Sequence, residues 1–278
     1  MRLIFYIIAV FLIIPSILVG QPLAKDFKPF VLGRVDSIRS IHWDQPRILN
    51  IYLPPGYEED SSTRYPVIYL LDGSSDEDFI HVAGLVQFLN FPWVNILPKS
   101  ILVGIANQDR RRDFTFPTRN QRDKAVSPSS GESANFIDFI ERELQPYMGS
   151  HYRTQSPKTL VGESLGGLLG AEILFKKPGL FDHYILVSPS LWWDDESLLK
   201  THPAFPGTGP ISGKKVFVSA GNEGIQMAKD ISQFMSILQK AKPRGLQSYY
   251  VGLPNETHAT ILHRALYKAF EVLNPKSK

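Results

Sequence analysis

The sequence predicts an α/β fold in which a mostly parallel central sheet is flanked by helices. Short, continuous apolar runs recur along the chain, and such runs are typical of strands that are buried on both faces. Segments with helical spacing lie between these runs, and strands that alternate with helices form right-handed crossovers and a parallel sheet. The chain has 278 residues, which fits one large domain of this class.

The individual elements follow in chain order. Two β-rich segments, 31–40 and 47–53, flank a polar turn and predict an antiparallel pair at a sheet edge. We expect strands buried on both faces at 66–71 and 101–105, and further strands at 160–161, 184–187, 216–218 and 249–251. Helical spacing predicts helices over 136–147, 168–175, 227–240 and 261–273.

Two long segments, 107–131 and 188–213, fit no regular element and follow strands. Loops of this length are often functional, and open α/β sheets place their sites at the carboxyl ends of strands. The second segment is too short for a large independent cap, so we expect no cap domain.

The N-terminus is typical of a secretory signal. Arg2 precedes an apolar run from Leu3 to Val19, and polar sequence begins after Gly20. We therefore expect a signal peptide at 1–20, a single domain at 21–278, and an exported protein, periplasmic or secreted. An uncleaved anchor and a buried core segment are the alternatives. A cleaved signal would leave no stable membrane association.

Composition excludes several classes of chemistry. The chain has no cysteine, which rules out thiol catalysis, disulfides and cysteine zinc sites. The net charge of +3 is not clustered, so nucleic acid is not an expected partner. There is no phosphate-binding or dinucleotide-binding glycine motif, and no histidine pair has metal-ligand spacing. We expect neither a metal nor an organic cofactor.

The most informative motif is Gly-Glu-Ser-Leu-Gly at 162–166. A β-prone run precedes it and a helical stretch follows it. This is the context of a nucleophile elbow, the sharp strand-to-helix turn that exposes the serine of α/β hydrolases. The turn strains the serine backbone, and the flanking glycines relieve crowding. Ser164 is therefore the expected nucleophile, at the N-terminus of a helix whose dipole favours developing negative charge.

The chain order of α/β hydrolases is nucleophile, acid, histidine. His258 follows the last predicted strand and is the expected base, ahead of His183, His202 and His263. Glu223 follows the preceding strand, where a carboxylate would orient the imidazole and stabilise the imidazolium. Two other carboxylates remain open as the acid, namely Asp230 and Glu256.

The remaining site residues are assigned from their places in the predicted loops. The oxyanion hole should use the N–H of Leu165 and a donor near Gly73 and Ser74. A simple strand-ending turn is the alternative for Gly73. Candidate substrate-binding residues are Arg110 and Arg112, as a cationic wall, and Trp192 and Trp193, as an aromatic wall. The arginines could instead pair with Asp113, and the tryptophans could instead anchor their loop.

Taken together, these motifs resemble the esterase family of α/β hydrolases that includes ferric-siderophore (enterobactin-type) esterases and relatives of S-formylglutathione hydrolase and feruloyl esterases. The matching segments cover nearly all of the chain after the leader: 65–73, 103–105, 109–110, 112–115, 135–136, 143–144, 162–167, 188–193, 221–223 and 256–258. The resemblance implies Ser164 as nucleophile, His258 as base and Glu223 as acid. Two departures are Glu163, where many relatives have histidine, and Ala259-Thr260, where relatives often have Gly-Ser.

The sequence therefore predicts a serine carboxylic-ester hydrolase that works through a Ser-Glu-His triad and an acyl-enzyme. Its partner would be a small-molecule ester, with siderophore-type, acyl-sugar and feruloyl-type esters all open. The alternative is a non-catalytic protein that uses the same fold to bind a ligand.

Overall fold

The computed structural model describes residues 28–201, 213–241 and 245–275. Residues 32–278 form one compact unit, separate from residues 1–31, and the description below concerns that larger unit. The predicted signal peptide lies outside the described residues. Among the helices that the model describes, none combines the length and apolar character needed to cross a membrane.

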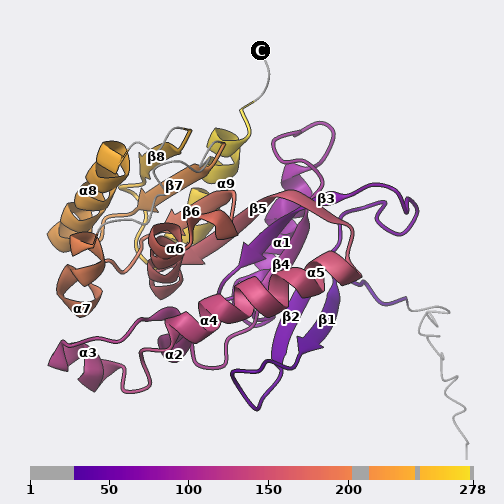
Figure 1. Ribbon diagram of the computed structural model, residues 1–278. Coiled ribbons are helices and arrows are strands. Elements are labelled where there is room, and N and C mark those ends of the chain that lie inside the picture. The colour runs from indigo at the N-terminus through magenta and orange to yellow at the C-terminus, as the bar shows by residue number, and fades with distance from the viewer. Residues whose placement is uncertain (1–27, 202–212, 242–244, 276–278) are drawn as a thin grey trace, which may run out of the picture. The chain divides into compact units, whose positions relative to one another are not determined.

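The centre of the fold is an eight-stranded sheet with the strand order β1-β2-β4-β3-β5-β6-β7-β8 (Figure 1). β2 pairs antiparallel with both β1 and β4, and every other pairing is parallel. The strands are β1 (Arg34–Ile38), β2 (Arg47–Tyr52), β3 (Tyr65–Leu70), β4 (Ile101–Ile105), β5 (Thr154–Glu163), β6 (His183–Val187), β7 (Lys215–Ala220) and β8 (Gln247–Gly252). The predicted mostly parallel sheet with an antiparallel edge is confirmed.

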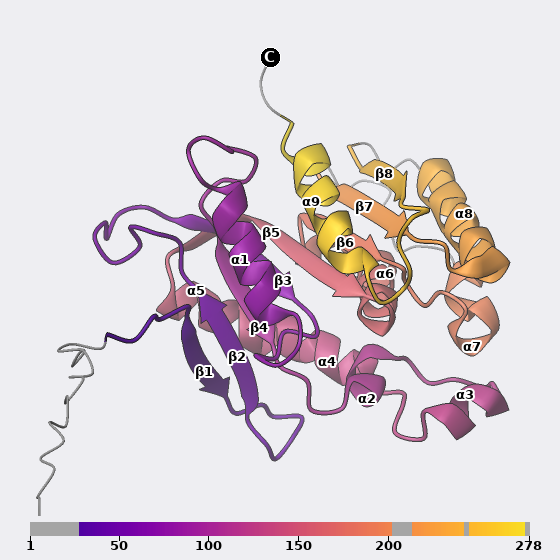
Figure 2. The same ribbon diagram turned by 180° about the vertical axis from the view of Figure 1, so that it is seen from behind.

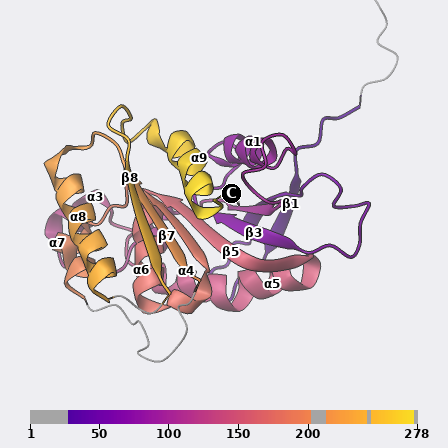
Figure 3. The same ribbon diagram turned by 90° about the horizontal axis from the view of Figure 1, so that it is seen from above.

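Helices cover both faces of this sheet. α1 and α9 lie on one face, and α4, α5, α6 and α8 lie on the other (Figures 2 and 3). The helices are α1 (Phe79–Leu89), α2 (Arg110–Phe114), α3 (Gln121–Val126), α4 (Ser133–Phe139), α5 (Gln145–His151), α6 (Leu165–Lys176), α7 (Trp193–Glu196), α8 (Gly224–Ala241) and α9 (Ile261–Leu273). A π-helical turn, Ile140–Leu144, joins α4 to α5, and short 3₁₀ turns span Pro178–Leu180 and Ser197–Lys200.

The alternation of side chains along the strands divides the core into two layers. Within β3, Val67 and Tyr69 pack with α4, α5, α6 and α8, whereas Ile68 and Leu70 pack with α1 and α9. Both sets are almost fully buried. This two-sided burial is the reason that the strands appear in the sequence as continuous apolar runs.

The topology gathers several loops at one edge of the sheet. β3, β5, β6, β7 and β8 run parallel, so their carboxyl ends lie together. The residues that follow these ends include Asp72, Ser164, Ser188, Glu223 and His258. This edge is where ligand sites of open α/β sheets are expected.

Candidate active site

Ser164 occupies a sharp turn between β5 and α6. Its backbone has φ 56° and ψ −117°, a left-handed conformation that non-glycine residues rarely adopt. The glycines around it allow the chain to fold back on itself: a Cβ on Gly162 would lie 2.4 Å from the carbonyl oxygen of Gly166. A Cβ on Gly167 would lie 2.9 Å from Cα of Pro189. The turn therefore has the strain and the close packing expected of a nucleophile elbow.

A second group forms where β7 and β8 end. Oε2 of Glu223 lies 2.5 Å from Nδ1 of His258. Oε1 of Glu223 accepts hydrogen bonds from the hydroxyl of Ser188 and, at 2.9 Å, from the N–H of Gly221. Burial opposes ionisation of this carboxyl, but the hydrogen bonds from Ser188, Gly221 and His258 hold the pKa of Glu223 below its usual value. Glu223 is therefore an anion placed against one nitrogen of the imidazole.

The two carboxylates that the sequence left open as alternatives to Glu223 have other partners. Asp230 is fully buried in α8 and accepts a hydrogen bond of 2.8 Å from Gln226, and burial raises its pKa. Glu256 forms an ion pair with Arg264 at 2.9 Å. Neither contacts a histidine.

The histidines considered as alternatives to His258 lie elsewhere in the chain. His183 begins β6, where burial lowers its pKa to about 4. His263 lies in α9 and packs against His81, with ring centroids 5.4 Å apart. His202 lies outside the described residues.

Ser164 and His258 line the same open pocket, which has a volume of about 430 Å³. The hydroxyl of Ser164 lies 3.3 Å from that of Ser190, a residue that the sequence analysis did not assign. In serine hydrolases without substrate, the hydrogen bond between the catalytic serine and its histidine is often long or poorly aligned, and it tightens only when substrate binds. Much of the remaining pocket wall is charged: Asp72, Glu77, Asp78, Glu163 and Arg110.

One of the expected oxyanion donors must be corrected. The N–H of Gly73 donates to the carbonyl of Ile105 at 3.0 Å, so it is already used within the sheet. A Cβ on Gly73 would lie 2.3 Å from Cα of Gly104, so glycine is required here for packing against β4. The N–H of Ser74 makes only a long contact of 3.4 Å to Glu77. Leu165, as expected, is the first residue of α6.

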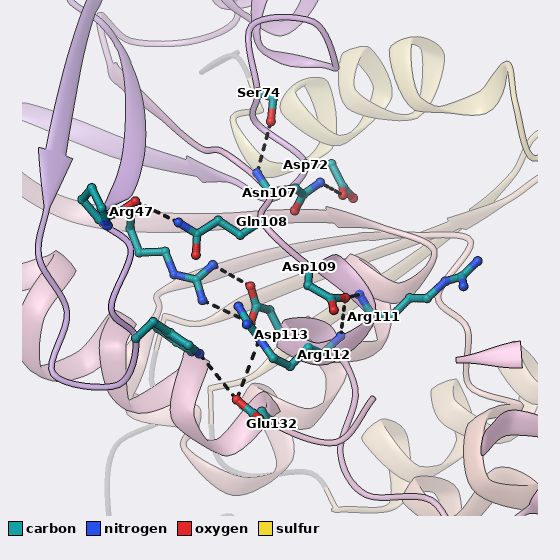
Figure 4. Close-up of polar contacts among 12 residues, drawn as sticks. Arg47, Asp72, Ser74, Asn107, Gln108, Asp109, Arg111, Arg112, Asp113 and Glu132 are labelled. Carbon is teal, nitrogen blue, oxygen red and sulfur yellow. Dashed lines mark hydrogen bonds and ion pairs between the residues drawn. The ribbon is translucent and has the colours of Figure 1, made fainter. Parts of the chain in front are cut away.

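Arg110 is the member of the arginine run that lines the pocket. Its guanidinium forms two hydrogen bonds with Asp72, at 2.7 and 2.9 Å. Asn107 donates to the same carboxylate at 2.6 Å (Figure 4). The guanidinium of Arg110 is thus already paired with a carboxylate of the protein itself.

The expectation that Arg112 faces the cleft is wrong. Its Nε donates to Asp113 at 2.9 Å, and Asp113 also binds the fully buried Arg47 at 2.6 Å (Figure 4). Arg47 stacks on Trp43, with 3.6 Å between its guanidinium carbon and the ring centroid. Arg112 therefore belongs to a structural network that holds α2 against β2, as the alternative pairing with Asp113 predicted.

The expected aromatic wall is also not formed. Trp193 is almost fully buried, and its indole N–H donates to the carbonyl of Phe116 at 2.9 Å. This contact anchors the loop after β6 to the loop after α2. Trp192 is partly exposed but does not line the pocket that contains Ser164.

Within the ranges that the structure describes, no group of three or more histidine, aspartate or glutamate side chains is arranged to hold a metal ion.

Comparisons with known proteins relate the whole chain to a family of hydrolases. The chain matches the family model described as "Putative esterase" over residues 40–252. It is 26% identical over 238 residues to the ferri-bacillibactin esterase BesA of Bacillus subtilis (strain 168), covering 79% of this chain and 82% of that one. It is 30% identical over 188 residues to a siderophore triacetylfusarinine C esterase of Aspergillus fumigatus, covering 60% and 59%. The crystal structure of an IroE-like serine hydrolase from Shewanella oneidensis superposes with a TM-score of 0.75 at 31% identity, covering 87% and 80%.

Proposed function

Because the chain belongs to the esterase family whose model it matches, we propose that Ser164, His258 and Glu223 are the catalytic triad of this ester hydrolase. The observation that carries the proposal is the Glu223–His258 contact of 2.5 Å, made in the same cluster of strand ends as the strained Ser164. Nucleophile, base and orienting acid thus come from three different strand ends, in the chain order of α/β hydrolases.

In the first half-reaction, Oγ of Ser164 attacks the ester carbonyl carbon and its proton passes to Nε2 of His258. The contact with Glu223 keeps the imidazole's own proton on Nδ1, so Nε2 is free to accept the proton of Ser164. The tetrahedral intermediate then expels the alcohol, which takes its proton from Nε2. This step leaves the acyl group bound to Ser164 as an ester.

In the second half-reaction, water gives a proton to Nε2 and attacks the acyl carbon. The acid product leaves and the proton returns to Oγ. In both steps the carbonyl oxygen becomes an oxyanion, which the N–H of Leu165 and the dipole of α6 would stabilise. The N–H of Ser74 is our candidate for the second donor, because Gly73 donates to Ile105.

The proposed substrate class rests on what two related proteins are named for. They are named for ferri-bacillibactin and for the siderophore triacetylfusarinine C. We therefore propose siderophore-type esters as the natural substrate class, with other acyl esters as the alternative. We also propose that the chain is exported, on the basis of the apolar segment from Leu3 to Val19.

Covalent labelling tests the catalytic proposal directly. A fluorophosphonate phosphonylates an activated serine, so it should add one label per chain, and peptide mass spectrometry should locate the label on Ser164. The Ser164→Ala variant should remain unlabelled. Hydrolysis of p-nitrophenyl acetate by the wild type gives the matching activity readout. A folded protein that neither hydrolyses this ester nor takes the label would support the non-catalytic binding function instead.

A further inference from the structure

The segment that follows β6 lies between β5, which leads to Ser164, and β7. On one side, the N–H of Ser164 donates to the carbonyl of Val187 at 3.0 Å, and the N–H of Ser190 donates to the carbonyl of Ser164 at 3.0 Å. On the other side, the N–H of Ser188 donates to the carbonyl of Ser219, in β7, at 2.8 Å. The backbone of this segment is therefore fixed to both neighbouring strands.

Ser188 is the residue of this segment that contacts the acid of the proposed triad. Its hydroxyl donates to Oε1 of Glu223, and within the part of the chain that the structure describes this is the only hydrogen bond of that hydroxyl. Ser188 is fully buried, with 0% of its surface exposed. A hydroxyl that donates to a carboxylate makes a charge-assisted hydrogen bond, which is stronger than one between neutral groups.

The two oxygens of the Glu223 carboxylate have separate partners. Oε1 accepts from the hydroxyl of Ser188 and, at 2.9 Å, from the N–H of Gly221, whereas Oε2 lies 2.5 Å from Nδ1 of His258. Two donors on one oxygen define the rotation of the carboxylate, because turning it would break both contacts. Gly221 belongs to the same loop as the acid, so Ser188 is the donor that ties this carboxylate to another strand.

The backbone of Ser188 indicates that its hydroxyl is retained at an energetic cost. Its φ is 43°, in the left-handed region that disfavours any residue with a Cβ. Glycine would adopt this conformation without that strain. Strained residues of this kind concentrate at functional sites. Serine at this position is therefore explained by what glycine lacks, which is the donor to Glu223.

The same hydroxyl helps to keep the acid charged. Burial opposes the charge of Glu223, but the donors around it hold its pKa below the usual value, and Ser188 is one of these donors. The charge matters because it stabilises the imidazolium that forms on His258 during each half-reaction.

We propose that Ser188 is a positioning residue of the esterase reaction: its hydroxyl fixes the Glu223 carboxylate so that Oε2 holds a proton on Nδ1 of His258. The proposal rests on the triad put forward above and adds to it a side chain that acts through Glu223. Because the hydroxyl acts on the acid and not on the substrate, its loss should slow turnover without weakening substrate binding. It should also matter only while Glu223 carries its charge.

The test uses two variants that remove the hydroxyl in different ways. Ser188→Ala keeps the Cβ and with it the backbone strain, whereas Ser188→Gly removes both. Ser219→Ala is the matched control, because Ser219 is also fully buried and its hydroxyl donates to the backbone carbonyl of Val251, at 2.7 Å, rather than to the triad. Steady-state hydrolysis of p-nitrophenyl acetate gives kcat and KM after the Ser164→Ala rate is subtracted, and urea denaturation checks each fold.

Both Ser188 variants should lower kcat by roughly 10- to 100-fold and change KM by less than about threefold, because a hydrogen bond to a charged group is lost and no substrate contact is. Ser219→Ala should stay near wild type. The alanine and glycine variants differ in backbone strain, so their stabilities should differ while their losses of kcat agree. That pattern would attribute the effect to the hydroxyl.

A double-mutant cycle with Glu223→Gln separates positioning from general damage to the fold. In that background the charge that Ser188 holds is gone, and the two donors on Oε1 would fix the amide with its nitrogen toward His258. Adding Ser188→Ala to Glu223→Gln should therefore change kcat by less than about twofold. A structural defect would instead multiply with the effect of Glu223→Gln, as independent effects do.

Two results would overturn the inference and leave the ester hydrolase function intact: wild-type kcat in folded Ser188→Ala, or the same loss of kcat from Ser188→Ala in both backgrounds. Ser219→Ala as damaging as Ser188→Ala would also count against it. Where Ser188→Ala fails to fold, Ser188→Gly decides on the same criteria, alone and combined with Glu223→Gln. Absence of ester hydrolysis in the folded wild type, or wild-type kcat in Glu223→Gln, would instead remove the proposed triad and the inference with it.

Discussion

The carboxylate of Glu223 links residues that follow three strands, β6, β7 and β8: one oxygen lies 2.5 Å from Nδ1 of His258, and the other accepts from Ser188 and from the N–H of Gly221. The side chain of Glu223 is almost fully buried, whereas that of His258 is about half exposed. Residues at the ends of β6 and β7 thus hold one oxygen of this carboxylate, and the other oxygen contacts the more exposed imidazole. In the proposed triad, this contact would favour the tautomer of His258 that carries its proton on Nδ1.

Replacing Glu223 with glutamine should lower kcat by roughly 10²- to 10⁴-fold, with a smaller effect on KM. The amide keeps the shape but can offer its nitrogen to Nδ1, which favours the wrong tautomer and removes the charge that stabilises the imidazolium. Steady-state hydrolysis of p-nitrophenyl acetate measures this effect. Asp230→Asn and Glu256→Gln are matched controls and should stay near wild type, because those side chains contact Gln226 and Arg264. A larger loss in either control would identify a different acid.

Ser164→Ala should lower kcat by about 10⁴-fold or more, because the nucleophile itself is lost. The fold should be retained, since the hydroxyl makes only the 3.3 Å contact with Ser190 and the backbone of the turn is held by packing. Far-ultraviolet circular dichroism would check the fold alongside the kinetics. Near wild-type turnover in a folded variant would contradict the assignment.

The sheet and the elbow could be predicted because their causes are local. Strands buried on both faces leave continuous apolar runs, and glycine at position 162 is required because a Cβ there would meet the backbone of Gly166 within the same turn. The sequence analysis missed α1, at Phe79–Leu89, because this helix is apolar on most sides and lacks a clear polar face. The short helices α2 and α3 lie in a segment expected to be a loop, where side chains of Asp109 and Asn120 cap each start.

The contents of the cleft were harder to predict, because they depend on long-range pairing. The arginine run suggested a cationic wall, but Asp72, 38 residues earlier in the chain, takes the guanidinium of Arg110. Arg112 shares Asp113 with Arg47, 66 residues away from that aspartate. A sequence lists these charges without stating which of them neutralise one another. For the same reason the net negative character of the pocket became visible only in the structure.

The buried pair of Arg47 and Asp113 gives a prediction about stability. Both side chains are almost fully buried, and they share two hydrogen bonds, at 2.6 and 3.2 Å. Arg47→Met should lower the free energy of unfolding by about 3–5 kcal/mol, because it leaves the Asp113 carboxylate with only the partly exposed Arg112. The double variant Arg47→Met with Asp113→Leu should recover much of this loss. Urea denaturation measures both, and a double variant less stable than the single one would contradict the argument.

The leader gives a prediction about processing. If Leu3 to Val19 is a cleaved signal, the exported protein should begin at or near Gln21. N-terminal sequencing of material from the periplasm or the medium would decide this. Full-length protein found only in membranes would favour the anchor instead.

Glu163 also gives a prediction about stability, and its sign follows from the raised pKa. The folded protein keeps a proton on Glu163 up to about pH 8, whereas the unfolded chain releases it at the ordinary value for glutamate. Between these two pH values the folded state binds more protons, so the contribution of Glu163 to stability falls as the pH rises. Glu163→Gln, which cannot ionise, should therefore match the wild type at acid pH and be more stable by roughly 1–3 kcal/mol at pH 9, allowing for partial exposure. Urea denaturation of both proteins from pH 4 to pH 9 would measure the difference. A constant difference at all pH values would mean that packing, not charge, explains the effect.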